Sequence, residues 1–449
     1  MYEHLTALGQ LPTRRADEIA GSRFSIGVET LDRGMWELEP ALPHLADLGA
    51  KWARVQTGWG RCETQPGVYD FGWLDAIVDR LIALGIEPWF NVGYGNQLYT
   101  PDAPHPTAVG WTPVREPAAR AGWAAFCTAL ARHYAGRVRF YEVWNEPDIK
   151  PFWTPYDPSP ADYANLVALT APALRAGQPG AQVVGGATAM ALGHAGFAWV
   201  SGCFEAGMGD HIDAFSYHIY TPTPEWRYEP MQPTLRALVD RYRPGLPLWQ
   251  GESGAPSLAV AGQALADCVF DEQRQAVWDA RRALLDLQHG VALSAFFHIA
   301  DFQFYIIKNE YVEREYYFGL LGGREMRRKP AYQAAQSLCT LLAGEVALDR
   351  AVNAQLQPAD QARTLAFGTE RGPLLAYWRA QDVMNPQPPV DGTLTVWMPE
   401  PWREPVLVDP ISQTVYVAPC EPGPHGTLRL TVPVCDWPWL VVEREAVGL

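Results

Sequence analysis

Two glutamates in this chain stand at the ends of strand-favouring runs, where a carboxyl group can do chemistry. Glu146 lies in FYEVWNEPD (residues 140–148), and Glu252 ends LPLWQGE (residues 246–252). Hydrolysis of a glycosidic bond needs two carboxyl groups in different protonation states: one protonates the leaving oxygen, and the other attacks or stabilises the sugar carbon. Either glutamate alone is explained as half of a salt bridge, but the pair favours catalysis. This chemistry requires no metal and no cofactor, and we expect none.

The segments that must position these glutamates alternate between short apolar runs and helix-period stretches, from residue 24 to about 342. This alternation predicts parallel strands joined by helical crossovers. In one crossover the apolar residues recur at helical spacing, as Leu74, Ile77, Val78 and Leu81. The predicted strands span residues 23–29, 51–57, 86–92, 139–145, 182–188, 212–218, 246–252 and 291–299.

Eight strands that are each followed by a helix specify an α/β fold, the (β/α)8 TIM barrel. In a barrel, Glu146 on the fourth strand and Glu252 on the seventh point to the same mouth. Glu142 lies four residues before Glu146, on the same side but deeper, and we interpret it as the partner of a buried arginine such as Arg54. An open doubly wound sheet is the alternative, but no G-x-G-x-x-G follows the first strand.

After about residue 342 the sequence pattern changes to short predicted strands separated by turns. This pattern is typical of a small antiparallel β domain. We therefore predict a catalytic barrel with a short N-terminal extension over residues 1–342 and a β-sandwich-like accessory domain over residues 343–449. Tryptophans of this second domain either bind sugar or pack against the barrel, and the pattern favours packing.

The composition limits the classes of molecule that this protein can bind. The net charge of −15 would repel nucleic acid and anionic membranes, so a neutral saccharide is the easier ligand. The seven cysteines show no C-x-x-C spacing, so neither a disulfide framework nor a zinc site is indicated. The first residues lack the apolar core of a signal peptide, and we expect a cytoplasmic protein. The sequence gives no indication of the oligomeric state.

The motifs, taken in order, resemble those of the clan A retaining glycoside hydrolases, and family 39, that of the β-xylosidases, in particular. The resemblance runs from about residue 24 to 342. It is carried by YEVWNEPD, then VVGGATA and AWVSGCFEAG, and then IDAFSYHIY. An N-E-P on the fourth strand, with H-x-Y on the sixth and a glutamate on the seventh, is a specific combination.

The resemblance implies a role for each matching residue. Glu146 would be the acid/base, Glu252 the nucleophile, and Asn145 a hydrogen-bond donor to the sugar 2-hydroxyl. His218 and Tyr220 match the sixth-strand pair, whose tyrosine lies beside the nucleophile. Arg54 matches the second-strand arginine, whose positive charge would keep the nucleophile ionised.

The chain departs from the family pattern at two places. The family usually shows T-E-W around the nucleophile, whereas this chain has Gly251, Glu252 and Ser253. On the eighth strand Phe297 replaces a tryptophan floor, and Gln303, Phe304 and Tyr305 stand where the xylosidases carry acidic residues that hold sugar hydroxyls. Xylose specificity is therefore open, while the hydrolytic mechanism is not affected.

Aromatic residues gather in the predicted mouth loops, as suits a carbohydrate cleft. Trp59 and Tyr94 lie nearest their strand ends, so we predict that they line the sugar site with Phe297. Two other functions compete with a retaining β-glycosidase: a non-catalytic carbohydrate-binding barrel and a metal-dependent hydrolase. The latter would need clustered His and Asp ligands at the strand ends.

Overall fold

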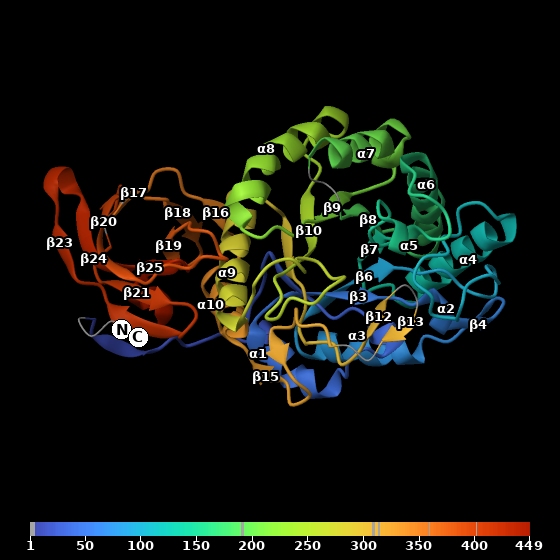
Figure 1. Ribbon diagram of the computed structural model, residues 1–449, viewed down its shortest axis with the longest axis horizontal. Helices are drawn as coiled ribbons and strands as arrows, with labels where there is room; N and C mark the ends of the chain where they lie inside the picture. Colours follow the sequence, from blue (N-terminus) through green and yellow to red (C-terminus); the bar gives the residue numbers. More distant parts are fainter. Residues whose placement is uncertain (1–4, 190–192, 308–309, 313–314, 359, 401) are drawn as a thin grey trace.

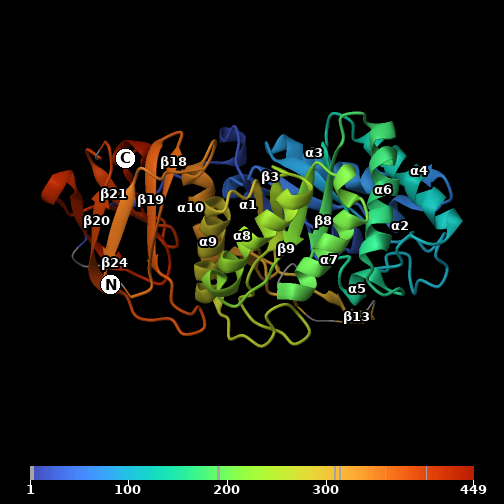
Figure 2. The ribbon, with the colours of Figure 1, turned by 90° about the horizontal axis from the view of Figure 1, so that it is seen from above.

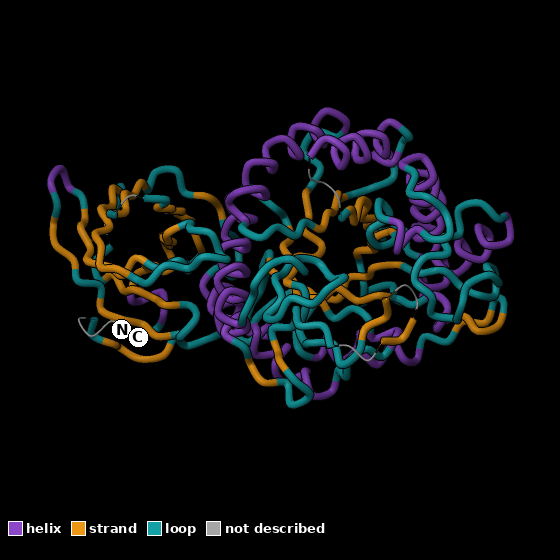
Figure 3. The backbone as a smooth tube through the Cα atoms, in the orientation of Figure 1, coloured by secondary structure: helices purple, strands orange, loops and turns teal. Residues whose placement is uncertain are grey.

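The barrel predicted from the sequence is present. The computed structural model describes residues 5–189, 193–307, 310–312, 315–358, 360–400 and 402–449. Eight parallel strands close into a barrel in the order β10-β11-β2-β3-β6-β7-β8-β9 (Figure 3). They are β2 (Phe24–Gly27), β3 (Trp52–Gln56), β6 (Glu87–Val92), β7 (Phe140–Val143), β8 (Gln182–Thr188), β9 (Ala214–His218), β10 (Leu248–Ser253) and β11 (Leu293–Phe296). Each overlaps a predicted strand, so the predicted TIM barrel is confirmed.

Eight helices follow these strands and form the outer ring of the barrel (Figure 3). In α3 (Gly72–Ala83) the four residues at helical spacing are all buried, so this apolar stripe packs on the strands. Gly85, just beyond the helix, has φ of +76°, a conformation that favours glycine. The other helices of the ring are α1 (Leu42–Leu48), α4 (Pro117–His133), α6 (Pro160–Gly177), α7 (Gly193–Glu205), α8 (Pro224–Tyr242), α9 (Glu272–Gln288) and α10 (Pro330–Leu341).

The second domain is a sandwich of two antiparallel sheets that share one apolar core (Figure 1). One sheet has the order β1-β22-β21-β25-β19-β18-β16, with β1 (Ala7–Gln10), β22 (Thr414–Val417), β21 (Pro405–Asp409), β25 (Trp439–Glu443), β19 (Gly372–Arg379), β18 (Ala362–Thr369) and β16 (Ala347–Leu348). The other has the order β17-β20-β24-β23, with β17 (Asn353–Gln357), β20 (Val390–Trp397), β24 (Leu428–Val434) and β23 (Cys420–Pro422).

The first strand of the N-terminal extension belongs to this second domain and not to the barrel. Strand β1 pairs antiparallel with β22, so the first described strand lies in the same sandwich as the C-terminal strands (Figure 1). Pairing between residues so far apart in sequence leaves no local signal, which is why the predicted boundary placed these residues with the barrel. All seven cysteines lie in the described part of the chain and are free thiols.

The seven-stranded sheet is buried on both faces at its centre, along β19, β21 and β25. Along β19, Leu375 and Tyr377 join the core of the sandwich, whereas Leu374, Ala376 and Trp378 join the core shared with the barrel. This alternation follows from the two-residue repeat of a strand. Helices α9 and α10 lie between the barrel strands and this sheet (Figure 2). Within the described residues, no helix combines the length and apolar character needed to cross a membrane.

Candidate active site

The barrel brings Glu146 and Glu252 together at its mouth, as predicted. Glu146 lies three residues beyond β7, and Glu252 is the penultimate residue of β10. One oxygen of each carboxyl group and one ring nitrogen of His218 all lie within 4.8 Å of one another. Retaining glycosidases place their carboxyl groups about 5–5.5 Å apart, whereas inverting enzymes leave about 6.5–9.5 Å. The observed spacing fits the retaining arrangement.

The turn after β7 aims Glu146 into the mouth through an uncommon backbone conformation. Trp144 and Glu146 have φ of 66° and 44°, in the left-handed region that residues other than glycine seldom occupy. Backbone hydrogen bonds hold this turn: Glu146 N–H donates to the Ala187 carbonyl at 2.9 Å, and Trp144 N–H to that of Val92 at 3.0 Å. Such strain persists where the surroundings enforce it, often at functional sites.

Arg54 contacts four other residues of the site and is completely buried. Its Nη1 donates to Glu29 Oε1 at 2.9 Å and to Glu252 Oε2 at 3.0 Å. Its Nε and Nη2 donate to Glu142 Oε2 at 2.9 and 2.5 Å, and Nη2 also donates to Asn145 Oδ1 at 2.7 Å. Burial opposes the charge of Arg54, but the three carboxylates outweigh burial and raise its pKa. The predicted pairing of Glu142 with Arg54 is therefore present.

Asn145 is oriented by this arginine. Since Arg54 donates to its carbonyl oxygen, the amide nitrogen is the donor that this side chain can offer to a sugar hydroxyl. This orientation suits the role that the motif implies.

The surroundings of Glu252 suit a carboxylate nucleophile. The Tyr220 hydroxyl donates to Glu252 Oε1 at 2.7 Å, while Arg54 donates to Oε2. Burial raises the pKa of Glu252, and Arg54 and Tyr220 act against that rise; the net direction is upward. Burial also raises the pKa of Tyr220, so its hydroxyl keeps the proton that it donates.

The surroundings of Glu146 favour its protonated form. Burial, followed by the charges of Glu252 and Asp148, raises its pKa well above the ordinary value. His218 Nδ1 lies 3.3 Å from Glu146 Oε1, but burial, and secondarily the charge of Arg54, depress the pKa of His218, so the imidazole is neutral. A protonated Glu146 beside an ion-paired Glu252 gives the division of labour that acid catalysis requires.

The glycine before the nucleophile has a steric reason. A Cβ atom on Gly251 would lie 3.0 Å from Glu142 Oε1 and 3.1 Å from His218 Nε2. These contacts are tighter than ordinary packing, so Gly251 makes room for the buried carboxylate and the imidazole. The departure from T-E-W is thus tied to the crowding of this barrel interior.

The predicted aromatic residues differ in placement. Trp59 is completely buried, donates to Glu63 Oε2 at 2.6 Å and stacks on Tyr99, so the prediction that its ring lines the sugar site is wrong for this structure. Tyr94 and Phe297 keep small exposed fractions of 4% and 8%. Tyr94 packs on Trp144 and Phe152. Their role as walls of the sugar site stays a prediction.

Four further residues surround the site without having been predicted from the sequence. Arg33 Nη2 donates to Gln56 Oε1 at 2.7 Å, and Gln56 Nε2 donates to the Tyr94 hydroxyl at 3.1 Å. Glu29 contacts Arg54, and His298 Nε2 lies 3.5 Å from Glu29 Oε2. Glu29 shares one signal with Glu252, a position at a strand end, and that signal could have identified it. The side chain of Tyr305 lies outside the described residues.

The trio Glu146, His218 and Glu252 has a spacing that a cation could use. Catalytic zinc sites bind through three protein ligands and keep one open position. Here, however, the guanidinium of Arg54 already contacts Glu252 Oε2, and its charge opposes a second cation at the same oxygen. The site is better suited to metal-free acid catalysis.

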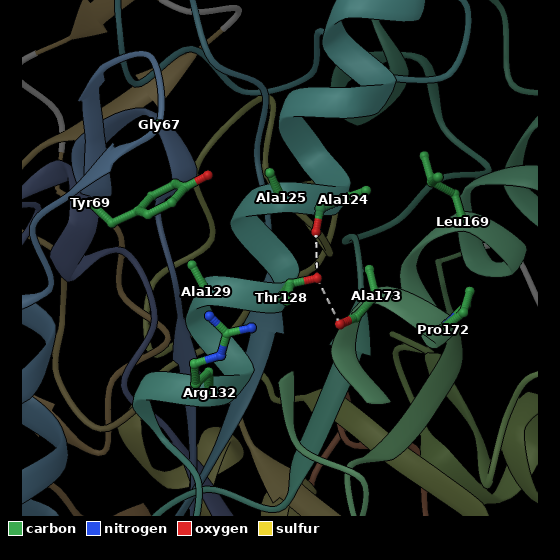
Figure 4. Close-up of a pocket in the computed structure, with 10 residues that line it drawn as sticks. All are labelled: Gly67, Tyr69, Ala124, Ala125, Thr128, Ala129, Arg132, Leu169, Pro172 and Ala173. Atoms are coloured by element: carbon green, nitrogen blue, oxygen red, sulfur yellow. Dashed lines mark hydrogen bonds between the residues drawn. The ribbon is translucent and has the colours of Figure 1, made fainter. Parts of the chain in front are cut away.

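A surface hollow of about 640 Å³ lies elsewhere, on the outer wall of the barrel (Figure 4). Small apolar side chains of α4 and α6 line it, and Thr128 Oγ1 lies 2.9 Å from the carbonyl oxygens of both Ala124 on α4 and Ala173 on α6. No carboxyl group is among its lining residues, so it lacks the groups that glycoside hydrolysis needs.

Comparisons with known proteins point to one family of glycoside hydrolases. Residues 56–233 match the family model for glycosyl hydrolases family 39. A β-xylosidase from Geobacillus stearothermophilus is 32% identical over 126 residues, an alignment that spans 26% of this chain and 24% of that relative's length.

Solved structures share the fold at lower identity. A family 39 glycoside hydrolase from Bacteroides cellulosilyticus WH2 superposes with a TM-score of 0.71 at 20% identity, over 97% of this chain and 83% of that one. A β-xylosidase from Caulobacter crescentus has a TM-score of 0.60 at 20% identity, over 87% and 83%. The resemblance to family 39 is thereby confirmed, and the matches support a glycoside hydrolase.

Proposed function

We propose that the protein is a retaining glycoside hydrolase that cleaves β-glycosidic bonds of a neutral saccharide or glycoside by double displacement. The observation that carries this proposal is the close approach of Glu146 and Glu252, within 4.8 Å, in surroundings of different charge. No room is left between them for the water that an inverting enzyme activates.

In the first step, Glu252 attacks the anomeric carbon while Glu146 protonates the leaving oxygen, and a covalent glycosyl–enzyme ester forms. In the second step, the ionised Glu146 removes a proton from water, which attacks the same carbon and releases Glu252. The contacts of Arg54 and Tyr220 fix both oxygens of Glu252, so its attack needs little reorganisation. Asn145 would strengthen its bond to the 2-hydroxyl as the ring flattens.

The test is to incubate the protein with an activated 2-deoxy-2-fluoro β-glycoside, beginning with the xyloside because xylosidases are among the relatives. Peptide mass spectrometry should then locate the adduct on Glu252, and proton NMR of a turned-over substrate should show a retained anomeric configuration. An adduct on another carboxyl group, or an inverted product, would contradict the assignment.

The two competing functions fail different tests. A non-catalytic carbohydrate-binding barrel would bind aryl β-glycosides from a panel of sugars without releasing the aryl group. A metal-dependent hydrolase would lose activity on prolonged treatment with EDTA. We expect turnover of at least one β-glycoside in the panel, and we expect that turnover to survive EDTA.

A further inference from the structure

Glu29 is a buried carboxyl group that the reaction described above does not use. It lies two residues after β2, and its side chain folds back over Gly27 into the barrel. A Cβ atom on Gly27 would come within 2.3 Å of Glu29 Oε2, so the position is open to Glu29 only because residue 27 is glycine. The side chain is 2% exposed.

Glu29 and the nucleophile share one nitrogen of the Arg54 guanidinium, and each can accept one of its two N–H groups. Arg54 Nη1 donates to Glu29 Oε1 at 2.9 Å and to Glu252 Oε2 at 3.0 Å. Both carboxyl groups thus draw on the same nitrogen, and the charge that Arg54 supplies to Glu252 depends on the charge of Glu29.

The second oxygen of Glu29 faces the Nε2 atom of His298. Glu29 Oε2 and His298 Nε2 lie 3.5 Å apart, and neither atom has a hydrogen-bond partner among the described residues. On the other side of the ring, His298 Nδ1 lies 3.0 Å from the Ala300 carbonyl oxygen and 3.2 Å from the Ala300 nitrogen. Ala300 therefore offers Nδ1 both an acceptor and a donor.

This arrangement serves a neutral His298 in either tautomer. With the proton on Nδ1, Nε2 accepts from a protonated Glu29; with the proton on Nε2, the ring donates to an ionised Glu29, and the Ala300 N–H donates to Nδ1. Glu29 can thus gain or lose a proton while His298 stays uncharged and bonded.

We propose that Glu29 is a positioning residue for the nucleophile: its protonation state, accommodated by His298, sets how much of the Arg54 charge Glu252 receives. This inference rests on the proposed retaining hydrolysis. When Glu29 is neutral, more of the positive charge of Arg54 acts on Glu252. When Glu29 is ionised, its charge offsets part of that attraction, and Glu252 is held less firmly for attack.

The titration falls in a testable range. Burial raises the pKa of Glu29 to about 7, against the lowering effect of Arg54, and burial lowers that of His298 to about 3. The charged groups that face this pair are Arg54 on β3, Glu252 on β10 and, through Arg54, Glu142 on β7. One pH unit above the pKa, about nine-tenths of Glu29 is ionised.

The experiment measures the rate at which a 2,4-dinitrophenyl 2-deoxy-2-fluoro β-glycoside labels Glu252, between pH 5 and pH 9. Because this leaving group needs no protonation, the ionisation of Glu146 does not limit the rate. In the wild type the rate should fall several-fold between about pH 6 and pH 8, in step with Glu29 ionisation. The Glu29→Gln variant is isosteric and stays neutral. Its labelling rates at about pH 6 and pH 8 should therefore agree within about twofold.

A matched control is Glu225→Gln, because Glu225 is also a buried glutamate beside a buried arginine, Arg281, but lies at the domain interface. It should keep the wild-type profile. A wild-type rate without a decline in this range overturns the inference even if Glu29→Gln does not fold, and so does a decline that persists in Glu29→Gln. If Glu252 is not labelled at any pH, the proposed function itself has failed, which is a distinguishable result.

Discussion

Arg54 at the barrel mouth and Arg281 at the domain interface are both completely buried, yet they bind different kinds of partner. Arg54 donates to three carboxyl groups and one amide oxygen. Arg281, on α9, donates to three backbone carbonyls of the sandwich: those of Asp436, Gln381 and Arg379, at 2.7, 2.7 and 2.8 Å. The carboxyl group of Glu225 lies 3.6 Å away.

This difference separates a working site from a structural one. Carbonyl oxygens satisfy a buried guanidinium but do not titrate, so the contacts of Arg281 are independent of pH. Burial lowers the pKa of Arg281, and Glu225 and Asp436 do not offset it. At Arg54 the carboxylates reverse that direction and raise its pKa. The charge of Glu252 also raises the pKa of Glu146. A buried arginine surrounded by titratable partners is therefore the stronger indication of catalysis.

The largest expected effect concerns the mouth. Glu146→Ala should reduce kcat/KM for a poor leaving group by about 10²- to 10⁴-fold, because proton donation is lost. It should reduce kcat/KM much less for an activated aryl glycoside, and azide should partly restore turnover. In the wild type, activity on the poor leaving group should decline on the alkaline side, since Glu146 must be protonated to act as acid. Equal losses on both leaving groups would exclude this role.

Replacing each arginine tests the comparison directly. Arg54→Met leaves three carboxyl groups without their cation and should cost about 3–5 kcal/mol of stability, together with a changed pH profile for labelling of Glu252. Arg281→Met leaves three carbonyls unpaired and should cost about 3 kcal/mol or more, at roughly 1–3 kcal/mol for each group. Its folded fraction should keep the wild-type kcat and pH profile. Urea unfolding and steady-state kinetics separate these outcomes, and an altered pH profile in Arg281→Met would erase the distinction.

A smaller effect is expected from the aromatic wall. Phe297→Leu should raise KM by about 2- to 10-fold, the range expected for loss of one aromatic contact, with little change in kcat. Trp378→Phe at the interface removes a hydrogen bond to Glu225 and should leave KM unchanged. If Phe297→Leu lowers the Tm with no rise in KM, the ring belongs to the core alone.

The smallest effect is expected from Asp279, a buried acid on the same helix as Arg281. Burial raises its pKa well above the ordinary value. Its folded form therefore prefers the proton, and the stability that this preference contributes is present at acid pH and is lost as the pH rises through the folded pKa. Asp279→Asn should raise the Tm at pH 8 and leave it nearly unchanged at pH 4. A higher Tm at pH 4 with no gain at pH 8 would reverse the sign.

The local pattern of the sequence was sufficient for the barrel. Helical periodicity, as in residues 74–81, and strand runs of regular spacing are properties of neighbouring residues, so they survive without tertiary information. Strand order then placed Glu146 and Glu252 at one mouth, because all parallel strands of a barrel end on the same side. The motif around Glu146 added an expected role for Asn145, and the match to the family's second-strand arginine added one for Arg54.

Tertiary structure decided what a residue type at a strand end does. Trp59 and Phe297 are both aromatic residues beyond strands, but only the packing of α4 against Trp59 shows that it is core, since Trp123 and Phe126 of that helix cover its ring. The same holds for β1, whose partner β22 is nearly the whole chain away. Burial depends on which distant segments meet, and local sequence does not record that.

The residues of the sequence determined which groups can hold a proton or a charge: Glu29, Glu142, Glu146, Glu252 and the histidines. The fold alone decided that three of these carboxyl groups meet around one guanidinium, with Glu29 and Glu252 on the same nitrogen. The physical reason is that a pKa depends on desolvation and on charges a few ångströms away, and those distances exist only after the strands have closed into a barrel.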